Sequence, residues 1–370
     1  MNLDWTPARS AALRLCLTPG VGSRTRKALL ERFQSAEGVL AAAMSELREV
    51  EGVGPKLAKA IAAAGELDLA PEISACEEGG VEIVLDIDRD YPESLQTLAD
   101  PPGALYCRGA FRPHDSLAVA IVGTRHATHY GLTQAAKLAG SLARAGYVVV
   151  SGLARGIDAA AHQGALKAGG RTLAVLGSGV LNIYPPEHEA LADEIANHGV
   201  VLGENPPRSP ALGGMFPQRN RIISGLSLGV IVVEADKGSG ALITARHATE
   251  QNRDIFAVPG PVDSRVSHGC HRLIRDGAKL VETVEDVLEE LGPLTKATTT
   301  PDGTSVHHPA ELQLNEVERA VLAAIGTKPV SVDEVVAAGE TPTARVLAIL
   351  SVLEMRRLIR RVGGNRVVRV

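Results

Sequence analysis

The chain has 370 residues, of which 45% are hydrophobic and only 3% aromatic, so more than one domain is expected, with cores of aliphatic side chains. The formal net charge of −5 excludes a chain that is basic throughout, although a nucleic-acid site needs only a local cluster of positive charge. The four cysteines follow no disulfide or metal-binding spacing. No apolar run reaches the ~18 residues of a membrane span and no signal region begins the chain, which predicts a soluble, cytoplasmic protein without membrane contact.

Residues 1–80 are expected to form a helical domain, because Ala and Leu dominate there and charges recur at helical spacing. Two Gly-Val-Gly turns, at 20–22 and 52–54, each precede a basic helix. This pattern is typical of a tandem helix-hairpin-helix (SAM-like) module, in which backbone N–H groups at helix starts contact a DNA backbone. The alternative is a helical scaffold or protein-docking bundle whose glycines only turn the chain.

Residues 81–291 are predicted to form a Rossmann-like domain with its core at 114–290. After a short strand at 81–85 and several turn signals, apolar runs alternate with helical segments. The runs lie at 117–122, 147–150, 172–176, 200–202, 229–233 and 254–258. Because they are continuous rather than alternating, they indicate strands buried on both faces of a doubly wound, mostly parallel sheet.

The remaining residues are predicted to form a linker and a small C-terminal domain. Residues 292–311 lack periodicity and are rich in Thr, Pro, Gly and Ser, as in a flexible linker. Residues 312–370 contain three helical segments and then a hairpin at 360–369, the pattern of a winged-helix-like domain. Such a domain can read duplex DNA or dock a protein, and both interpretations stay open.

Candidate binding residues follow the predicted strands, because ligands of open α/β sheets bind beyond the carboxyl ends of the strands. Several strand ends supply glycine together with a hydroxyl group or an arginine, which indicates an extended groove for a polyanion. The candidates are Gly123, Thr124, Arg125, Ser151, Gly152, Arg155, Phe216, Arg219, Asn220, Arg221, Lys237, Ser239, Gly240 and Thr244. Phe216 can stack on a base. The alternative is that Phe216 belongs to the core and that the arginines pair with Glu204 or Glu234.

Other site chemistries find little support in the sequence. No G-x-G-x-x-G fingerprint follows a strand, so no dinucleotide cofactor is expected. Asp158 and His162 are helix neighbours without a positioned nucleophile, and we interpret them as hydrogen-bonding groups that anchor the helix, not as a catalytic acid–base pair. The cluster at 268–271 lacks the partners that a metal site would need.

Several motifs of the α/β region resemble, in order, those of the DNA-processing protein DprA family, also called Smf. The longest are S-G-L-A-R-G-I-D-A-A-A-H at 151–162, F-P-Q-R-N-R-I-I-S-G-L-S at 216–227 and S-H-G-C-H-R-L-I-R-D-G-A-K-L-V at 267–281, and shorter ones lie at 121–125, 232–235, 239–245 and 256–260. The resemblance implies a non-enzymatic protein that binds single-stranded DNA, protects incoming strands in natural transformation or repair, and assists RecA. It also implies DNA contacts at Arg125, 152–155 and 216–221.

The resemblance further implies a homodimer formed near His271, Leu273 and Leu280. A nucleotide-processing enzyme of the lysine-decarboxylase-like Rossmann group is the alternative function. Those enzymes carry a P-G-G-x-G-T-x-x-E loop. The nearest stretch here, at 238–250, lacks the Pro-Gly-Gly and spaces the Glu differently.

Overall fold

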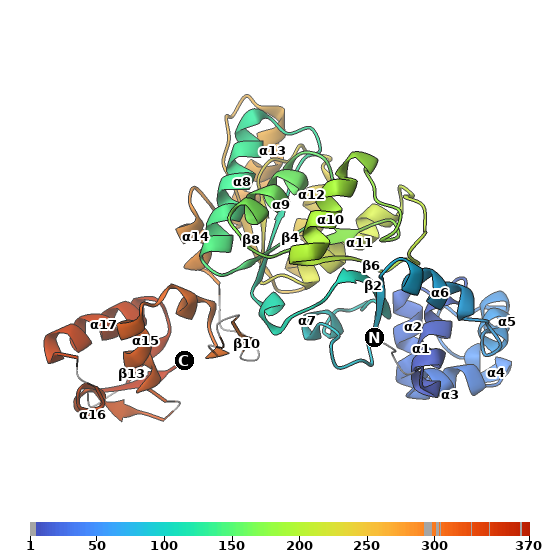
Figure 1. Ribbon diagram of the computed structural model, residues 1–370, viewed down its shortest axis with the longest axis horizontal. Helices are drawn as coiled ribbons and strands as arrows, with labels where there is room; N and C mark the ends of the chain where they lie inside the picture. Colours follow the sequence, from blue (N-terminus) through green and yellow to red (C-terminus); the bar gives the residue numbers. More distant parts are fainter. Residues whose placement is uncertain are drawn as a thin grey trace. The chain divides into compact units, whose positions relative to one another are not determined.

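The chain forms two units, Met1–Leu280 and Val281–Val370. The computed structural model describes residues 5–291, 298–300, 303, 305–326, 328–339, 341–362 and 365–370. Figure 1 shows the order of the helices and strands along the chain.

The N-terminal residues form the expected cluster of helices, drawn in blue in Figure 1. These are α1 (Pro7–Leu17), α2 (Ser23–Phe33), α3 (Ala36–Ala41), α4 (Met44–Leu47), α5 (Pro55–Ala64) and α6 (Ala70–Glu78). The two Gly-Val-Gly turns lead directly into α2 and α5. Gly20 and Gly52 have φ values of 88° and 84°, a left-handed conformation that favours glycine. The predicted tandem of hairpins is confirmed.

A nine-stranded sheet forms the centre of the first unit. Its strands are β1 (Glu82–Leu85), β2 (Ala104–Gly109), β3 (Ala118–Val122), β4 (Val148–Ser151), β5 (Thr172–Leu176), β6 (Val200–Gly203), β7 (Gly229–Val232), β8 (Asp254–Ala257) and β9 (Lys279–Leu280). Their order is β1-β2-β6-β5-β4-β3-β7-β8-β9, parallel from β6 to β9. The predicted mostly parallel sheet is confirmed. β2, which was not predicted, pairs antiparallel with β1 and β6 and extends that edge.

Helices connect the parallel strands in two series. α8 (His129–Arg144), α9 (Ile157–Lys167) and α10 (Glu189–His198) lead from β3 out to β6, and α11 (Met215–Gly225), α12 (Gly240–Glu250) and α13 (His268–Arg275) lead from β6 back past β3 to β9. Right-handed crossovers that run in opposite directions place the two series on opposite faces of the sheet. The winding therefore reverses between the neighbouring strands β3 and β7, and this switch point is where open α/β sheets bind ligands.

The N-terminal helices pack on the sheet and share its core. Leu13 and Leu29 lie in the same buried cluster as Ile83 and Tyr106 of β1 and β2. The buried Arg26 side chain pairs with Asp86, with 2.8 Å between Nη2 and Oδ1, and Arg9 pairs with Asp88. Arg26 also approaches Gly103, where a Cβ atom would lie 2.4 Å from its Nε. The helices and the sheet are thus held together by both apolar packing and ion pairs.

The second unit contains the predicted winged helix. Its elements are α14 (Val284–Leu288), β10 (Thr298–Thr299), β11 (Ser305–Val306), α15 (Glu316–Ala323), β12 (Val330–Ser331), α16 (Val332–Ala337), α17 (Thr343–Met355), β13 (Ile359–Val362) and β14 (Arg366–Arg369). The three helices α15–α17 and the small sheet β12-β14-β13 enclose a separate apolar core.

The segment predicted as a linker contains regular structure where none was expected. β10 pairs with β11, and a short 3₁₀ helix spans Pro309–Gln313. Glu311 of this helix accepts a hydrogen bond from Arg369, with 2.7 Å between Oε1 and Nη2. Residues 292–297, 301–302 and 304 of the predicted linker lie outside the described residues.

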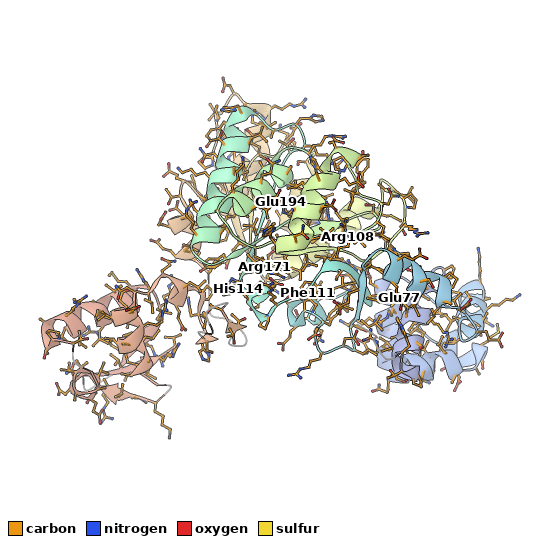
Figure 2. The ribbon with its side chains drawn as sticks, in the orientation of Figure 1. Glu77, Arg108, Phe111, His114, Arg171 and Glu194 are labelled. Atoms are coloured by element: carbon orange, nitrogen blue, oxygen red, sulfur yellow. The ribbon has the colours of Figure 1, made fainter. Side chains whose placement is uncertain are left out.

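Arg171, which Figure 2 shows close to His114, forms an ion pair with Asp115 that ties the start of β5 to the loop before β3. Nη2 of Arg171 lies 2.8 Å from Oδ2 of Asp115, whose exposed fraction is 7%. Arg171→Ala would leave this carboxylate buried without its cation, and we expect the free energy of unfolding to fall by about 3 kcal/mol. Urea unfolding of the full chain measures the change.

Arg108→Ala is the matched control, because its partner Asp193 is 56% exposed and an exposed pair contributes less than about 1 kcal/mol. Equal losses of stability in the two variants would contradict the burial argument.

Candidate functional site

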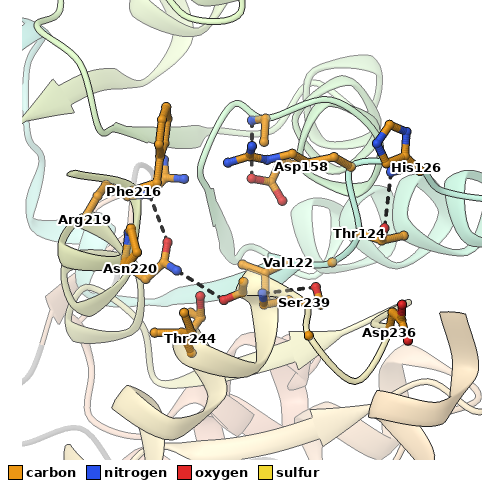
Figure 3. A pocket seen from close by; sticks show the side chains of 18 of the residues that line it. Val122, Thr124, His126, Asp158, Phe216, Arg219, Asn220, Asp236, Ser239 and Thr244 are labelled. Atoms are coloured by element: carbon orange, nitrogen blue, oxygen red, sulfur yellow. Dashed lines mark hydrogen bonds between the residues drawn. The ribbon is translucent and has the colours of Figure 1, made fainter. Parts of the chain in front are cut away.

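A cleft of about 820 Å³ opens at the switch point of the sheet (Figure 3). Its walls come from the ends of β3 and β7, the turn after β4, and helices α11 and α12. The predicted residues that line it are Gly123, Thr124, Arg125, Phe216, Arg219, Asn220, Ser239, Gly240 and Thr244. Residues from separate strand ends thus meet in one place, and we call it the switch-point cleft.

Arg219 is the buried cation of the switch-point cleft, with an exposed fraction of 7%. Its Nη1 donates to the carbonyl oxygens of Gly152, at 2.7 Å, and Val175. Gly152 permits this approach, since a Cβ atom there would lie 2.4 Å from Nη2 of Arg219. Burial lowers the pKa of Arg219 to about 10, although the carboxylate of Asp158 opposes the shift, so the guanidinium is charged at neutral pH. Burial also raises the pKa of Asp158, and Arg219 counteracts that rise.

Arg125 and Phe216 form the accessible side of the cleft. The exposed guanidinium of Arg125 lies over the ring of Phe216, with Cζ 5.1 Å from the ring centroid. The half-buried Phe216 ring also faces Tyr184, at 5.7 Å between centroids. Arg125 is close enough to Arg219 to contribute to the lowered pKa of Arg219. The two guanidinium groups therefore repel each other within one cleft, and a bound anion would relieve the repulsion.

The start of α12 supplies polar groups to the opposite wall. The side chain of Ser239 caps the helix by accepting a hydrogen bond from the N–H of Ala241, at 3.3 Å. Asn220 donates from Nδ2 to the carbonyl oxygen of Gly240, at 3.2 Å, which fixes α11 to this turn. The positive end of the helix dipole thus faces the same cleft as Arg125 and Arg219.

Other predicted residues lie beside the cleft rather than in its wall. Ser151 is buried and donates to the carbonyl oxygen of Ile121, at 2.6 Å. Gly152 and Arg155 line a small adjoining hollow with Arg125, Tyr184 and Phe216. Arg155 is half exposed and pairs with Glu187. Lys237 is exposed and is absent from the lining of the cleft.

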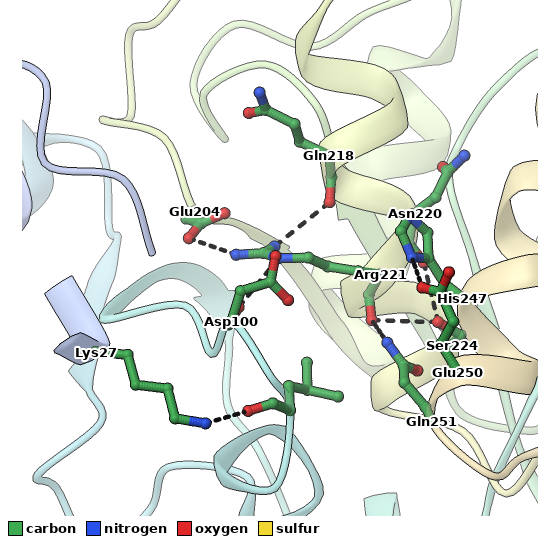
Figure 4. A network of polar contacts seen from close by, with 11 residues as sticks. Lys27, Asp100, Glu204, Gln218, Asn220, Arg221, Ser224, His247, Glu250 and Gln251 are labelled. Atoms are coloured by element: carbon green, nitrogen blue, oxygen red, sulfur yellow. Dashed lines mark hydrogen bonds and ion pairs between the residues drawn. The ribbon is translucent and has the colours of Figure 1, made fainter. Parts of the chain in front are cut away.

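Arg221 faces away from the cleft and pairs with acids, as the alternative interpretation of the arginines had it (Figure 4). Its Nη2 lies 2.8 Å from Oε1 of Glu204, and its Nε lies 3.2 Å from Oδ2 of Asp100. Glu234, the other acid considered, instead accepts hydrogen bonds from the backbone N–H and the hydroxyl of Thr128, at 2.9 and 2.6 Å. The alternative interpretation, in which the arginines pair with Glu204 or Glu234, therefore holds for Arg221 but not for Arg219.

Among the further residues that line the cleft, the sequence did not mark the polar side chains of His126, Tyr184, Asp236 and Arg265 as site residues. Arg265 is exposed and pairs with Asp236, at 3.1 Å. Tyr184 lies in a Tyr-Pro-Pro turn after β5, and this turn was the one signal that could have marked it. The pairing of Asp236 with Arg265 joins distant parts of the chain and has no local signal.

Asp158 and His162 each form a hydrogen bond with a different partner, in agreement with the interpretation that they anchor the helix. Asp158 accepts from the backbone N–H of Ala154, at 3.3 Å. Nδ1 of His162 lies 2.7 Å from Oγ1 of Thr172, whose own proton goes to the carbonyl oxygen of Val149. Nδ1 must therefore carry the proton, and the buried Nε2 has no hydrogen-bond partner among the described residues. Burial lowers the pKa of His162 to about 3.

This pKa makes the stability of the fold depend on pH. Below about pH 6.5 the unfolded chain binds a proton at His162 that the folded protein does not bind until about pH 3. The free energy of unfolding should therefore fall with decreasing pH, by up to about 1.4 kcal/mol per pH unit from this residue. His162→Asn should flatten the dependence between about pH 6 and 4 in urea titrations. The exposed His129→Asn should keep the original slope, and equal slopes in the two variants would contradict the assignment.

None of the helices in the described residues is both long enough and apolar enough to cross a membrane. No three His, Cys, Asp or Glu side chains in the described part of the chain are grouped so that they could hold a metal ion.

Family profiles match all three parts of the chain. Residues 82–292 match DNA recombination-mediator protein A, residues 306–365 match the DprA winged helix domain, and residues 13–65 match a SAM-like helix-hairpin-helix tandem. Together with the fold, these matches define a three-part DNA-processing protein. The chain belongs to the DNA recombination-mediator protein A family, also known as DprA or Smf.

Individual relatives agree with this assignment. Protein Smf of Synechocystis is 35% identical over 378 residues, covering 94% of this chain and 95% of that protein. DNA processing protein DprA of Bacillus subtilis is 41% identical over 244 residues, covering 66% and 78%. The X-ray structure of DprA from Streptococcus pneumoniae has a TM-score of 0.69 at 35% identity, covering 76% and 98%. A DprA structure from Helicobacter pylori, described for its single-stranded DNA binding mode, has a TM-score of 0.51 at 32% identity, covering 56% and 93%.

Proposed function

We propose that the protein binds single-stranded DNA in the switch-point cleft and acts as a binding protein, not as an enzyme. The observation that carries the proposal is that the guanidinium groups of Arg125 and Arg219 line one cleft together with the Phe216 ring, over which Arg125 lies. The two arginines and the start of α12 line the same cleft and are groups that bind phosphate. The single-stranded DNA binding of the Helicobacter pylori relative supports this use of the fold.

Phe216 accounts for the preference for single strands and for the tolerance of sequence. An aromatic ring stacks on the face of any base, but only a base that is not paired and stacked in a duplex offers that face. Stacking contributes about 1–3 kcal/mol per base, comparable to a phosphate contact. The cleft therefore suits a strand that is already single.

In the cell this binding would protect incoming single strands and assist RecA during natural transformation, with DNA repair as a second setting. The assistance to RecA rests on family membership. We also propose that the protein is a homodimer formed at the β9 edge of the sheet. His271 and Leu273 are partly buried there, whereas Leu280 on the edge strand is 40% exposed and available to a second copy.

Fluorescence anisotropy with labelled oligonucleotides tests the binding proposal. The full chain should bind an oligothymidylate more tightly than a duplex of equal length, and log K should fall with log salt by about 0.7 per neutralised phosphate. Equal affinity for both DNAs, or an affinity that salt does not change, would overturn the proposal.

A further inference from the structure

A second cleft, of about 620 Å³, lies between the N-terminal helices and the α/β part of the first unit. One wall is the first Gly-Val-Gly turn with the beginning of α2, including Ser23 and Arg24. The facing wall includes Arg246 and His247 of α12. This hairpin cleft is separate from the residues that bind DNA in the proposed function.

The two clefts meet along α11 and α12. Pro217 of α11 and Ile243 of α12 line both of them. Positions Ile243, Arg246 and His247 are three and four residues apart, so they share one face of α12. Thr244 belongs to the neighbouring face, which lines the switch-point cleft. One helix therefore forms part of the wall of both clefts, and Pro217 and Ile243 border both.

The charge of the hairpin cleft suits a phosphodiester chain. Arg24 is exposed, and no carboxylate pairs with it among the described residues. Arg246 is 68% exposed, and it forms only a long ion pair of 3.9 Å with the 61% exposed Glu250 on its own helix, a pair that contributes little. The acids in the wall, Asp100 and Glu204, are both paired with Arg221, as Figure 4 shows. The cations on the two walls are therefore the groups left to meet a ligand.

The start of α2 adds backbone donors to the same wall. Gly22 is the N-cap, with extended backbone and no side-chain capping hydrogen bond. The first N–H groups of this helix, at Ser23, Arg24 and Thr25, have no partner within the helix and lie in the wall of the cleft. They favour a phosphate next to the two arginines.

We propose that the strand bound in the switch-point cleft continues over Pro217 and Ile243 into the hairpin cleft, with its phosphates next to Arg24 and Arg246. The two clefts then form a single track for single-stranded DNA, and the N-terminal helices bind the strand instead of serving only as a scaffold. The inference rests on the proposed function, since the strand is held first in the switch-point cleft. It predicts that the hairpin cleft matters only for strands long enough to reach it.

The test compares two oligothymidylates, of about 6 and about 24 nucleotides, a range that spans typical single-strand site sizes. In the full-length variant Arg24→Ala/Arg246→Ala, affinity for the short strand should change less than about twofold, while affinity for the long strand should fall about tenfold. The salt slope for the long strand should shrink by about 1.4, the value for two phosphates. The exposed pair Lys137→Ala/Arg144→Ala on α8 is the charge-matched control and should change neither strand.

Three results would overturn the track. These are an unchanged affinity for the long strand, an equal loss for both strands, and a loss confined to duplex DNA, which would indicate a separate duplex site in the hairpin cleft. Failure of the proposed function looks different, because then the unaltered protein binds neither oligonucleotide and Arg125→Ala has no effect. Arg24→Lys/Arg246→Lys should recover most of the affinity for the long strand if charge carries the contact.

Discussion

Arg125→Ala is expected to weaken single-strand binding about tenfold to a hundredfold, with little change in the free energy of unfolding. A hydrogen bond to a charged group contributes about 1.5–3 kcal/mol, which corresponds to that range of affinity. The free energy of unfolding changes little, because Arg125 is exposed and its two contacts have opposite effects. The cation–π contact with Phe216 stabilises the fold, whereas the repulsion between Arg125 and Arg219 destabilises it.

Anisotropy titrations with an oligothymidylate at several salt concentrations measure the effect. The salt slope should shrink by about 0.7 if one phosphate contact is lost. Arg125→Lys should fall between the alanine variant and the original protein, because lysine keeps the charge but lacks the planar fork of donors. An Arg125→Ala protein that binds as before at every salt concentration would place the DNA elsewhere.

The sheet was largely predictable because its central strands are buried on both faces. Continuous apolar runs such as 117–122 and 172–176 coincide with β3 and β5 to within a residue. The antiparallel extension was not predictable in the same way. β2 is a six-residue strand directly after a Pro-Pro-Gly turn, in a region that reads as a connector. Its place beside β6 depends on long-range pairing, which no local pattern records.

The site was predictable by position but not by side-chain direction. The rule that ligands bind at strand ends located the cleft, since the residues after β3 and β7 do meet there. The sequence predicts a DNA contact for both Arg219 and Arg221, because no predicted helix over 216–221 separates their directions. In α11, side chains two residues apart point about 200° away from each other around the helix axis. The guanidinium of Arg219 therefore enters the cleft, whereas that of Arg221 faces Glu204. Asp158, the acid beside Arg219, comes from a different helix and could not be paired with it from the sequence.

Arg219→Met is expected to have the largest effect, because it changes both stability and binding. The variant removes the donor to the carbonyl oxygens of Gly152 and Val175, and it removes the positive charge that counteracts the raised pKa of the buried Asp158. The lost hydrogen bonds and the lost compensating charge near a buried carboxylate should together lower the free energy of unfolding by about 3 kcal/mol in urea titrations. Single-strand affinity should fall more than about a hundredfold, since a buried cation of the cleft and its geometry are lost together.

A second variant separates these two losses. Arg219→Met/Asp158→Asn removes both charges, and it should recover much of the stability because no uncompensated carboxylate stays buried. If the positive charge of Arg219 attracts DNA, the stable double variant still binds weakly, whereas recovered binding would show that Arg219 only holds the turn after β4 in place. Asp158→Asn alone leaves the buried guanidinium without its acid, so it should destabilise the fold, yet it should not weaken binding, because the cleft becomes more positive. A double variant that regains stability but still binds DNA weakly is therefore the result that shows that the positive charge of Arg219 attracts the DNA.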